Sequence, residues 1–429
     1  MIIESLKIRG FRALYDAEVE PGSFTVLAGA NNSGKTTLAD ALDFLAEVYR
    51  FKLEVALSRK GGFENVAFRR MRRTRRPVSI EVRVAIDTSE VRPFLQRKRK
   101  NRQTNQGQIV VTHKFAFKAA SAAIAADFSV VEEWLTIDHR PDAAGQLDRL
   151  ITVTRNGSKV DVKSLGYERL PESLASLKEY GFELEFAEEQ EFESTVLFIE
   201  AVTFHPLVRQ FTRALTGVRI FQISPLQSRL AGVPTPNPAL ERYGQNLPAL
   251  IEYFRDRAED AWESVFGAMQ EIIPNLEKID TEFSIDRRLV LRFWERGVGR
   301  PWSANEISDG TIQSLALFCA LFDPRVTLAF IEEPENSVHP WIVRVFADAC
   351  RRAAESGRQI FVTTHSPALL QRARPSEVKL IWRSEGRSTI APLLQLDPEA
   401  EKLWEDGTSD VFELLDSGAL RQAIPEGSA

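Results

Sequence analysis

The sequence is poor in features that mark several classes of protein. Its 429 residues contain only two cysteines, Cys319 and Cys350, which fits a reducing cytoplasm and predicts two buried core thiols. No apolar run is long enough for a membrane span, and the opening residues MIIESLKIRGF alternate like a strand and lack the apolar core of a signal peptide. We therefore expect a soluble, cytoplasmic protein with no membrane partner.

Repeats and a uniform charge are missing as well. There is no heptad array long enough for a coiled coil and no internal repeat. A net charge of −5 excludes a uniformly basic nucleic-acid-binding coat, while 44% hydrophobic and 27% charged residues indicate a globular chain. The length allows two or three domains, or one large motor domain with insertions.

Residues 29–37, GANNSGKTT, are the stretch around which the rest is organised. Gly29, Gly34, Lys35 and Thr36 complete the phosphate-loop spacing G-x-x-x-x-G-K-S/T, between a predicted buried strand at 24–28 and a predicted helix. Glycine allows backbone amides to wrap the phosphates, while lysine supplies charge and threonine a Mg²⁺ ligand. The expected ATP-binding residues are Gly29, Ala30, Asn31, Asn32, Ser33, Gly34, Lys35, Thr36 and Thr37.

A different periodicity follows the loop. Residues 77–86, 110–117, 134–137 and 150–154 alternate with period two between polar turns, which predicts an inserted antiparallel lobe. A strand and a proline-rich linker are expected at 216–240, and apolar residues at helical spacing from Leu250 to Met269 predict one long amphipathic helix.

Clustered arginines lie in the predicted lobe. Such clusters can displace counterions from a phosphate backbone, but they are equally well explained as solvated loops or as partners of the acidic run at 183–193. Both explanations stay open. The residues for a possible nucleic-acid contact are Arg69, Arg70, Arg72, Arg73, Arg75 and Arg76.

Three motifs follow in the last third of the chain. NEISDGTIQ, residues 305–313, predicts a turn that opens a helix, and VTLAFIEEPE, residues 326–335, predicts a strand buried on both faces that ends in Glu332 and Glu333. IFVTTHSP, residues 360–367, is a second short buried strand, and it ends in His365. Strand ends of this kind carry the ligand sites of open α/β sheets.

In this order the motifs resemble those of the ABC-type ATPases of the RecF, SMC and OLD-like group. The resemblance also covers the opening strand and hairpin of residues 3–28, and it implies that two copies form a dimer around ATP. It implies that Ser308, Asp309 and Gly310 form a signature loop facing the nucleotide of the second copy, and that His365 is the switch histidine. Asp309 replaces the second glycine of the common signature, and Gln222 is a possible Q-loop residue.

The same resemblance assigns the chemistry of the two carboxylates. Glu332 takes the Walker B position, where aspartate is usual, and would hold Mg²⁺ with Thr36, while Glu333 would act as the general base that orients water. OLD nucleases carry a Toprim domain after the motor, but the tail here has no D-x-D pair, so we expect no nuclease.

The predicted fold is α/β, a P-loop NTPase of the ABC-ATPase head type with an inserted antiparallel β and helical lobe. The motor is expected at 1–50 and 285–429 and the lobe at 51–284. The function expected first is an ATP-hydrolysing, DNA-linked sensor or scaffold, as in anti-phage defence or DNA repair, acting with a separate effector protein. The alternatives are a low-turnover, nucleotide-gated scaffold that sequesters a partner protein, and the ATPase subunit of a transporter.

Overall fold

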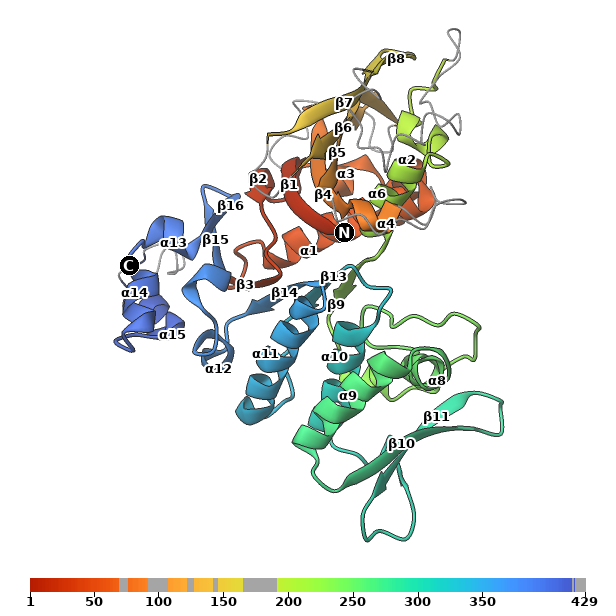
Figure 1. The fold of residues 1–429 in the computed structure, drawn as a ribbon, viewed down its shortest axis with the longest axis vertical. Coiled ribbons are helices and arrows are strands. Elements are labelled where there is room, and N and C mark those ends of the chain that lie inside the picture. The colour runs from red at the N-terminus through yellow and green to blue at the C-terminus, as the bar shows by residue number, and fades with distance from the viewer. Residues whose placement is uncertain are drawn as a thin grey trace. The chain divides into compact units, whose positions relative to one another are not determined.

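The computed structural model describes residues 1–68, 76–91, 107–121, 127–141, 146–164, 191–418 and 420 (Figure 1). Contacts divide the chain into two compact units. Unit 1 comprises residues 1–21, 37–217 and 384–389, and unit 2 comprises residues 22–36, 218–383 and 390–429.

Unit 1 is built on a seven-stranded sheet of order β2-β1-β4-β5-β6-β7-β8, in which every neighbouring pair is antiparallel. Buried residues alternate along β4, because one face of the sheet packs on the core. The strands predicted at 77–86, 110–117, 134–137 and 150–154 are confirmed. The strands are β1 (Ile2–Phe11), β2 (Leu14–Val19), β4 (Val78–Asp87), β5 (Gln108–Ala119), β6 (Phe128–Arg140), β7 (Asp148–Asn156) and β8 (Lys159–Ser164).

Aromatic side chains fix the helices of unit 1 on this sheet. Phe44 packs on Phe117 with ring centroids 5.9 Å apart, and Tyr49 meets Phe211 edge to face at 5.5 Å. The helices that lie within this unit are α2 (Leu53–Arg59), α3 (Phe63–Val66), α4 (Thr88–Val91), the 3-10 helix η4 (Phe198–Ala201) and α6 (Pro206–Thr216).

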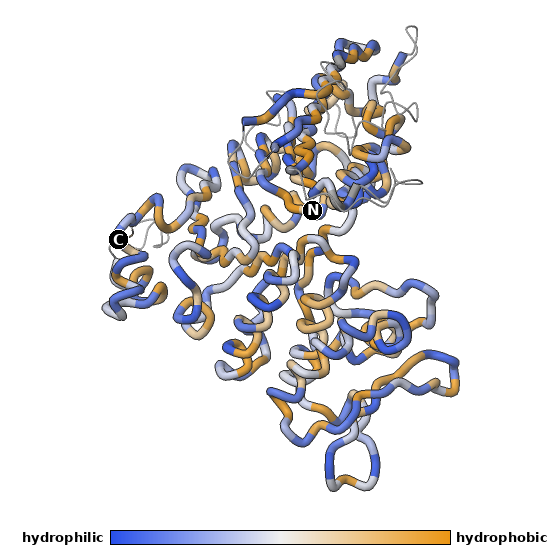
Figure 2. Tube along the Cα trace, in the orientation of Figure 1, coloured by the Kyte–Doolittle hydropathy of each residue, from blue (hydrophilic) through white to orange (hydrophobic). Residues whose placement is uncertain are grey.

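A second sheet, of order β16-β15-β3-β14-β13-β9, belongs to unit 2 except for the last residue of β15 and the first half of β16, and its strands β15, β3, β14, β13 and β9 run parallel. Every residue of β3, β13 and β14 is buried, as a parallel sheet covered on both faces requires, and most of β13 and the middle of β14 are coloured hydrophobic in Figure 2. The strands are β3 (Phe24–Ala28), β9 (Val218–Phe221), β13 (Leu328–Glu332), β14 (Gln359–Thr364), β15 (Val378–Ser384) and β16 (Arg387–Pro392).

The helices of unit 2 form one hydrophobic core with that sheet. Every residue from Ile312 to Phe322 of α10 is buried, including Cys319, and Cys350 of α11 is buried too, so both thiols lie in the core as predicted. Helices here are α7 (Pro225–Ser228), α8 (Leu247–Arg257), α9 (Glu259–Ile272), α10 (Asp309–Phe322), α11 (Pro340–Glu355), α12 (Pro367–Leu370), the 3-10 helix η5 (Pro375–Glu377), α13 (Leu393–Leu396), α14 (Ala400–Glu405) and α15 (Val411–Asp416).

The single long helix predicted between Leu250 and Met269 is wrong. The chain forms α8 and α9, with Ala258 between them at φ −143° and ψ 58°. The buried residues of the two helices stay in phase across the break, so periodicity alone cannot reveal it. A small antiparallel sheet follows, made of β10 (Leu276–Phe283), β11 (Leu289–Glu295) and β12 (Trp302–Ser303).

The first strands of the chain take part in the sheet of unit 1. Because β1 pairs with both β2 and β4, residues 1–21 share a unit with the predicted inserted strands, and the phosphate loop lies in unit 2. Helix α1 (Lys35–Phe51) begins in unit 2 and continues into unit 1. The expected assignment of 1–50 and 285–429 as the working motor stays a prediction.

Candidate functional site

The phosphate-loop sequence leaves β3 at Ala28 and enters α1 at Lys35, so the predicted strand, loop and helix are confirmed. Gly29 passes close to β15, and a Cβ there would lie 2.1 Å from the carbonyl oxygen of Ile381. Gly34 has a φ of 115°, a conformation that residues with side chains rarely adopt. Both glycines of the motif are therefore required by the backbone itself.

Lys35 is folded over its own loop. Lys35 is only 7% exposed, and its Nζ donates to the carbonyl oxygens of Gly29 (2.6 Å) and Ala30 (3.1 Å). Burial lowers the pKa of Lys35, and the nearby carboxylates of Glu333, Glu335 and Glu332 oppose that shift. The ammonium thus lies in the field of three acidic side chains.

The remaining predicted loop residues differ in exposure. Ser33 is buried and its amide donates to Ala30 O (3.2 Å), while Asn31 and Thr36 are exposed and Thr37 is half-buried. The exposed Asn32 has a left-handed backbone, with φ at 63°. Its Oδ1 accepts from the Arg383 guanidinium on β15 (3.1 Å).

The paired carboxylates follow β13, two strands from β3. Glu332 is buried, and its Oε1 accepts from the guanidinium of Arg242 at 2.8 Å. Glu333 has a φ of 46°, which is uncommon for a residue with a side chain and is typical of functional sites. Its amide donates to Thr363 O on β14 (3.0 Å), so the turn after β13 is pinned to the neighbouring strand.

His365 follows β14 and lies beside the acidic turn, residues 332–335, at the end of β13. Its Nδ1 lies 3.7 Å from Glu333 Oε1 and 3.8 Å from Glu335 Oε1, and its side chain is 56% exposed. Asn336 Nδ2 donates to Glu333 Oε2 (3.2 Å). The structure therefore brings the predicted Glu333 and His365 together at one strand edge.

Glu335 is a site residue that sequence reasoning missed. Its Oε1 accepts from the Thr364 hydroxyl (2.7 Å) and from the His365 amide (3.2 Å), so this carboxylate fixes the end of β14. The other oxygen, Oε2, is buried and has no hydrogen-bond partner among the residues that the structure describes. Its place in the EEPE turn was visible in the sequence, but its partners were not.

The predicted signature residues cap a helix. Ser308 is the N-cap of α10, and its Oγ accepts from the Thr311 amide at 3.2 Å. Ser308 and Asp309 are exposed. A Cβ on Gly310 would lie 3.1 Å from Ser337 O, so glycine lets this loop approach the turn after Glu335 closely.

Two further predicted sites stand apart from these groups. Gln222 is exposed and comes directly after β9, which pairs with β13, and its amide donates to Arg242 O (2.7 Å). Arg76 is exposed and donates to the Tyr15 hydroxyl (3.1 Å). The other arginines of the basic run lie outside the described residues: Arg69, Arg70, Arg72, Arg73 and Arg75.

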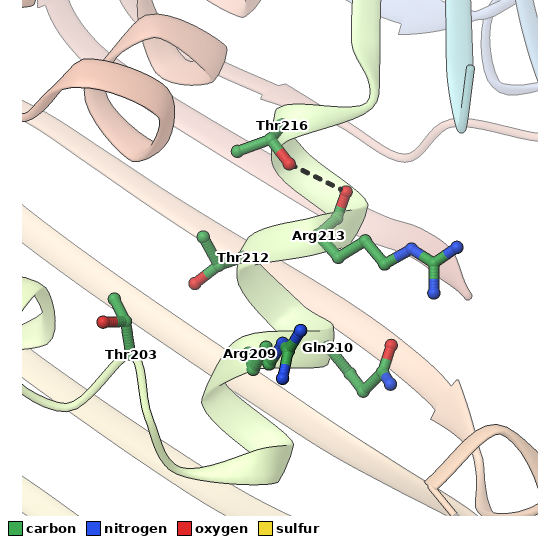
Figure 3. A pocket seen from close by; sticks show the side chains of 6 residues that line it. All are labelled: Thr203, Arg209, Gln210, Thr212, Arg213 and Thr216. Atoms are coloured by element: carbon green, nitrogen blue, oxygen red, sulfur yellow. Dashed lines mark hydrogen bonds between the residues drawn. The ribbon is translucent and has the colours of Figure 1, made fainter. Parts of the chain in front are cut away.

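Unit 1 contains a separate cavity of about 370 Å³ beside α6 (Figure 3). Thr203 and Thr212 lie on one side of the helix, whereas Gln210 and Arg213 are directed to the other, so the lining does not converge on one point. None of the residues that line it is a predicted site residue: Thr203, Arg209, Gln210, Thr212, Arg213 and Thr216.

Neither a preformed metal cluster nor a membrane-spanning helix is found among the residues that the structure describes. The described part of the chain contains no cluster of three or more His, Cys, Asp or Glu side chains that could hold a metal by themselves. In the same part, no helix combines the length and the apolar character that crossing a membrane requires.

Comparisons with known proteins add two family models and three structures. The model "AAA ATPase domain" matches residues 1–200, and "AAA domain, putative AbiEii toxin, Type IV TA system" matches residues 179–371. No curated protein matches the chain in sequence.

Three SMC head structures are among the solved structures to which the chain is similar. An SMC head bound to the C-winged helix domain of ScpA has 12% identity and a TM-score of 0.47, covering 91% of this chain and 98% of that one. The SMC head domain from Thermotoga maritima has 12% identity and a TM-score of 0.40, and the match covers 91% of this chain and 99% of that one. An SMC head bound to the ScpA C-terminal domain from Pyrococcus furiosus has 13% identity and a TM-score of 0.44, and the match covers 95% of this chain and 100% of that one.

Because these TM-scores and identities are low, we compare the chain with known families by the two family models. Between them the models match residues 1–371, the stretch that holds the phosphate loop, the signature loop, the acidic turn and His365. Over residues 1–371 the chain is therefore similar to AAA ATPase domains.

Proposed function

We propose that the chain binds and hydrolyses ATP in the cytoplasm, and that two copies close around the nucleotide. The observation that carries this proposal is a shared strand edge. The loop of residues 29–34, His365 and Glu333 follow β3, β14 and β13, which are parallel neighbours. Open α/β sheets bind ligands outside the carboxyl ends of such strands, and the start of α1 favours a phosphate group there.

In this proposal Glu333 accepts a proton from the attacking water, and His365 contacts the terminal phosphate. The distances support a shared task, since one oxygen of Glu333 lies near His365 and the other accepts from Asn336. Lys35 stabilises the charge that develops on the phosphate oxygens. The three carboxylates near Lys35 raise its pKa and so favour the charged ammonium.

Thr36 and Glu332 would hold Mg²⁺, which neutralises charge on a triphosphate when bound. Magnesium is usually bound by one or two carboxylates plus substrate phosphates and water, and not by a complete protein cage. One buried carboxylate at a strand end, without a metal cluster among the described residues, fits that pattern.

The second half of each site would come from the other copy. Ser308 and Asp309 are exposed at the N-terminus of a 14-residue helix, where amides and the helix dipole favour an anion. Gly310, beside them, adds no side chain that would block close approach. We assign this loop to the γ-phosphate held by the phosphate loop of the partner.

The decisive experiment uses Glu333→Gln, which retains the shape of the side chain and removes the base. With ATP and Mg²⁺ the variant is expected to accumulate as a dimer in analytical ultracentrifugation, and with ADP as a monomer. A Glu333→Gln protein that stays monomeric at saturating ATP would overturn the proposal. Lys35→Ala in the same background is the matched control, because it should bind no ATP and form no dimer.

For the biological role we propose a DNA-linked sensor or scaffold in a defence or toxin-like system with a separate effector protein. The description of the second family model supports the toxin-like part. Clustered arginines from Arg69 to Arg76 support the nucleic-acid part. Duplex binding that weakens with salt, and is lost when Arg72, Arg73, Arg75 and Arg76 become alanine, is the expected result.

Two other functions predict different measurements. A low-turnover scaffold that sequesters a partner protein would show little change of its steady-state ATPase rate in Glu333→Gln, because it hardly turns over. A transporter subunit would need a membrane partner to copurify with it, and neither family description supports that. A measurable ATPase rate that falls strongly in Glu333→Gln favours the hydrolysing dimer.

A further inference from the structure

One segment of unit 2 contacts both the Walker B carboxylate and the signature loop. Residues 222–243 leave the end of β9 and return to it, since the amides of Gln222 and Ser224 donate to the carbonyls of Arg242 (2.7 Å) and Tyr243 (3.1 Å). The two ends of the segment are therefore tied together beside β13. Each of its halves supplies one arginine, Arg229 after α7 and Arg242 near the return.

Arg229 holds the backbone of the loop that leads into α10. Its Nε donates to Ala304 O (2.8 Å) and one terminal nitrogen donates to Ile307 O (2.5 Å), while the other contacts the Asp309 carboxylate. The Arg229 side chain is 15% exposed, whereas that of Asp309 is 65% exposed. A guanidinium has five donors in a fixed plane, so one side chain can fix three points of a loop that lysine could not hold together.

Arg242 holds the other end. Its guanidinium donates to Glu332 Oε1 at 2.8 Å, and the Glu332 side chain is almost fully buried. A buried carboxylate is strongly stabilised by such a charge-assisted bond. Segment 222–243 is thus bound to the end of β13 by Arg242 and to the signature loop by Arg229.

We propose that Arg229 is a positioning residue that sets the signature loop for the nucleotide of a second copy, and that segment 222–243 couples this loop to Glu332. The inference rests on the proposed ATP-bound dimer. Among the described residues, Arg229 has no hydrogen bond or ion pair with the phosphate loop or with residues 332–335, so it acts by holding Ala304, Ile307 and Asp309, which flank Ser308. The proposal also gives Asp309 a task, because the residue that departs from the common signature is the one that accepts from Arg229.

The test is dimerisation of Glu333→Gln with ATP and Mg²⁺, with and without Arg229→Ala. We expect Arg229→Ala to weaken the dimer at least about tenfold, because three contacts to the loop are lost. Binding of a fluorescent ATP analogue to the monomer should not change, since the phosphate loop is untouched. Arg229→Lys should recover only part of the dimer, because an ammonium cannot span the same acceptors.

Arg300→Ala is the matched control. Arg300 is exposed and pairs with the exposed Glu306 (3.4 Å) beside the same loop, so its removal should leave the dimer unchanged. If Arg229→Ala dimerises as tightly as its parent, or no more weakly than Arg300→Ala, the inference is wrong while the proposed function stands. If Glu333→Gln alone never dimerises, both fall.

A mixing experiment separates positioning from loss of fold. An Arg229→Ala protomer keeps its phosphate loop, and a Lys35→Ala protomer keeps its signature loop, so a mixed dimer contains one complete site. We expect differently tagged copies, both in the Glu333→Gln background, to form ATP-dependent heterodimers, although Lys35→Ala forms no homodimer and Arg229→Ala forms only a weakened one. Failure of the mixture, with Arg229→Ala still binding the ATP analogue, would contradict action across the dimer.

Discussion

Each of the two units contains a histidine paired with a glutamate, but the two pairs differ in their exposure to solvent and in their other partners. In unit 1, His113 Nε2 lies 3.3 Å from Glu133 Oε1, and both side chains are 0% exposed. In unit 2, His365 lies 3.7 Å from Glu333 and 3.8 Å from Glu335, and more than half of its side chain is exposed. One pair is closed to solvent and the other lies at an open strand edge.

The buried pair is fully occupied by the protein. Glu133 also accepts from the amides of Phe198 (2.8 Å) and Ile199 (3.2 Å) and lies 3.6 Å from the Arg155 guanidinium, while His113 Nδ1 is 2.7 Å from the Tyr49 hydroxyl. A buried charge needs such partners, and their loss is costly. The residue types are the same in both units, so the number of internal partners, and not the type, separates a structural site from a candidate catalytic one.

The largest expected effect concerns stability. Glu133→Ala should lower the free energy of unfolding by about 3–5 kcal/mol, because it removes the counter-charge of buried Arg155 and leaves two buried amides without their acceptor. Urea denaturation followed by circular dichroism measures it. Glu132→Ala is the matched control on the same strand, since Glu132 is exposed and pairs only at the surface with Lys114 (2.6 Å), and it should change stability by less than about 1 kcal/mol. Equal losses in both variants would remove the contrast between the pairs.

The second prediction is a loss of activity without a loss of stability. Glu333→Gln should lower the ATP turnover rate by about 10²-fold or more, as expected when a general base is lost, and should leave the midpoint of thermal unfolding unchanged. Phosphate release under steady-state conditions and a thermal melt are the two measurements. Glu355→Gln, at the exposed end of α11, should alter neither. A turnover rate that survives Glu333→Gln would mean that this pair is as structural as the one in unit 1.

The third prediction concerns Glu335, whose partners resemble those of Glu133 although it lies at the open edge. Glu335→Ala removes the acceptor of the Thr364 hydroxyl and of the His365 amide, so we expect turnover to fall about tenfold and stability by about 1 kcal/mol. Glu335→Gln keeps an acceptor oxygen and should be milder in both assays. If the glutamine variant were as impaired as the alanine variant, the negative charge and not the hydrogen bonding would be what matters.

Sequence reasoning succeeded where a feature is local. The strand before Gly29, the helix after Lys35, the buried strand ending in Glu332 and the helix after Ser308 each follow from a short window of residues. The resemblance to RecF, SMC and OLD-like ATPases depends on the order of those windows, and both matched family models describe AAA domains.

Features that depend on distant residues could not be predicted. Arg242 reaches Glu332 across 90 positions and Arg229 reaches Asp309 across 80, and nothing near an arginine in the sequence names its acceptor. The pairing of β1 with β4 could not be predicted either, because the alternation of apolar and polar residues in a strand does not identify the neighbouring strand. His113 and Glu133 were overlooked because they lie in ordinary alternating strands, where a buried polar pair leaves no pattern.

The smallest effect is expected at the rim of the buried pair. Tyr49→Phe keeps the ring that packs on Phe211 and removes only the hydroxyl next to His113 Nδ1. Burial raises the pKa of Tyr49 well above its ordinary value, and the charge of Glu133 adds to that rise, so the hydroxyl is neutral throughout the working pH range and the loss is that of one neutral hydrogen bond, about 1 kcal/mol. Tyr243→Phe, on an exposed tyrosine, should cost nothing measurable in the same denaturation experiment. A Tyr49→Phe protein as stable as its parent would mean that His113 is held by Glu133 alone, and the contrast with His365 would then rest on burial and on that single carboxylate.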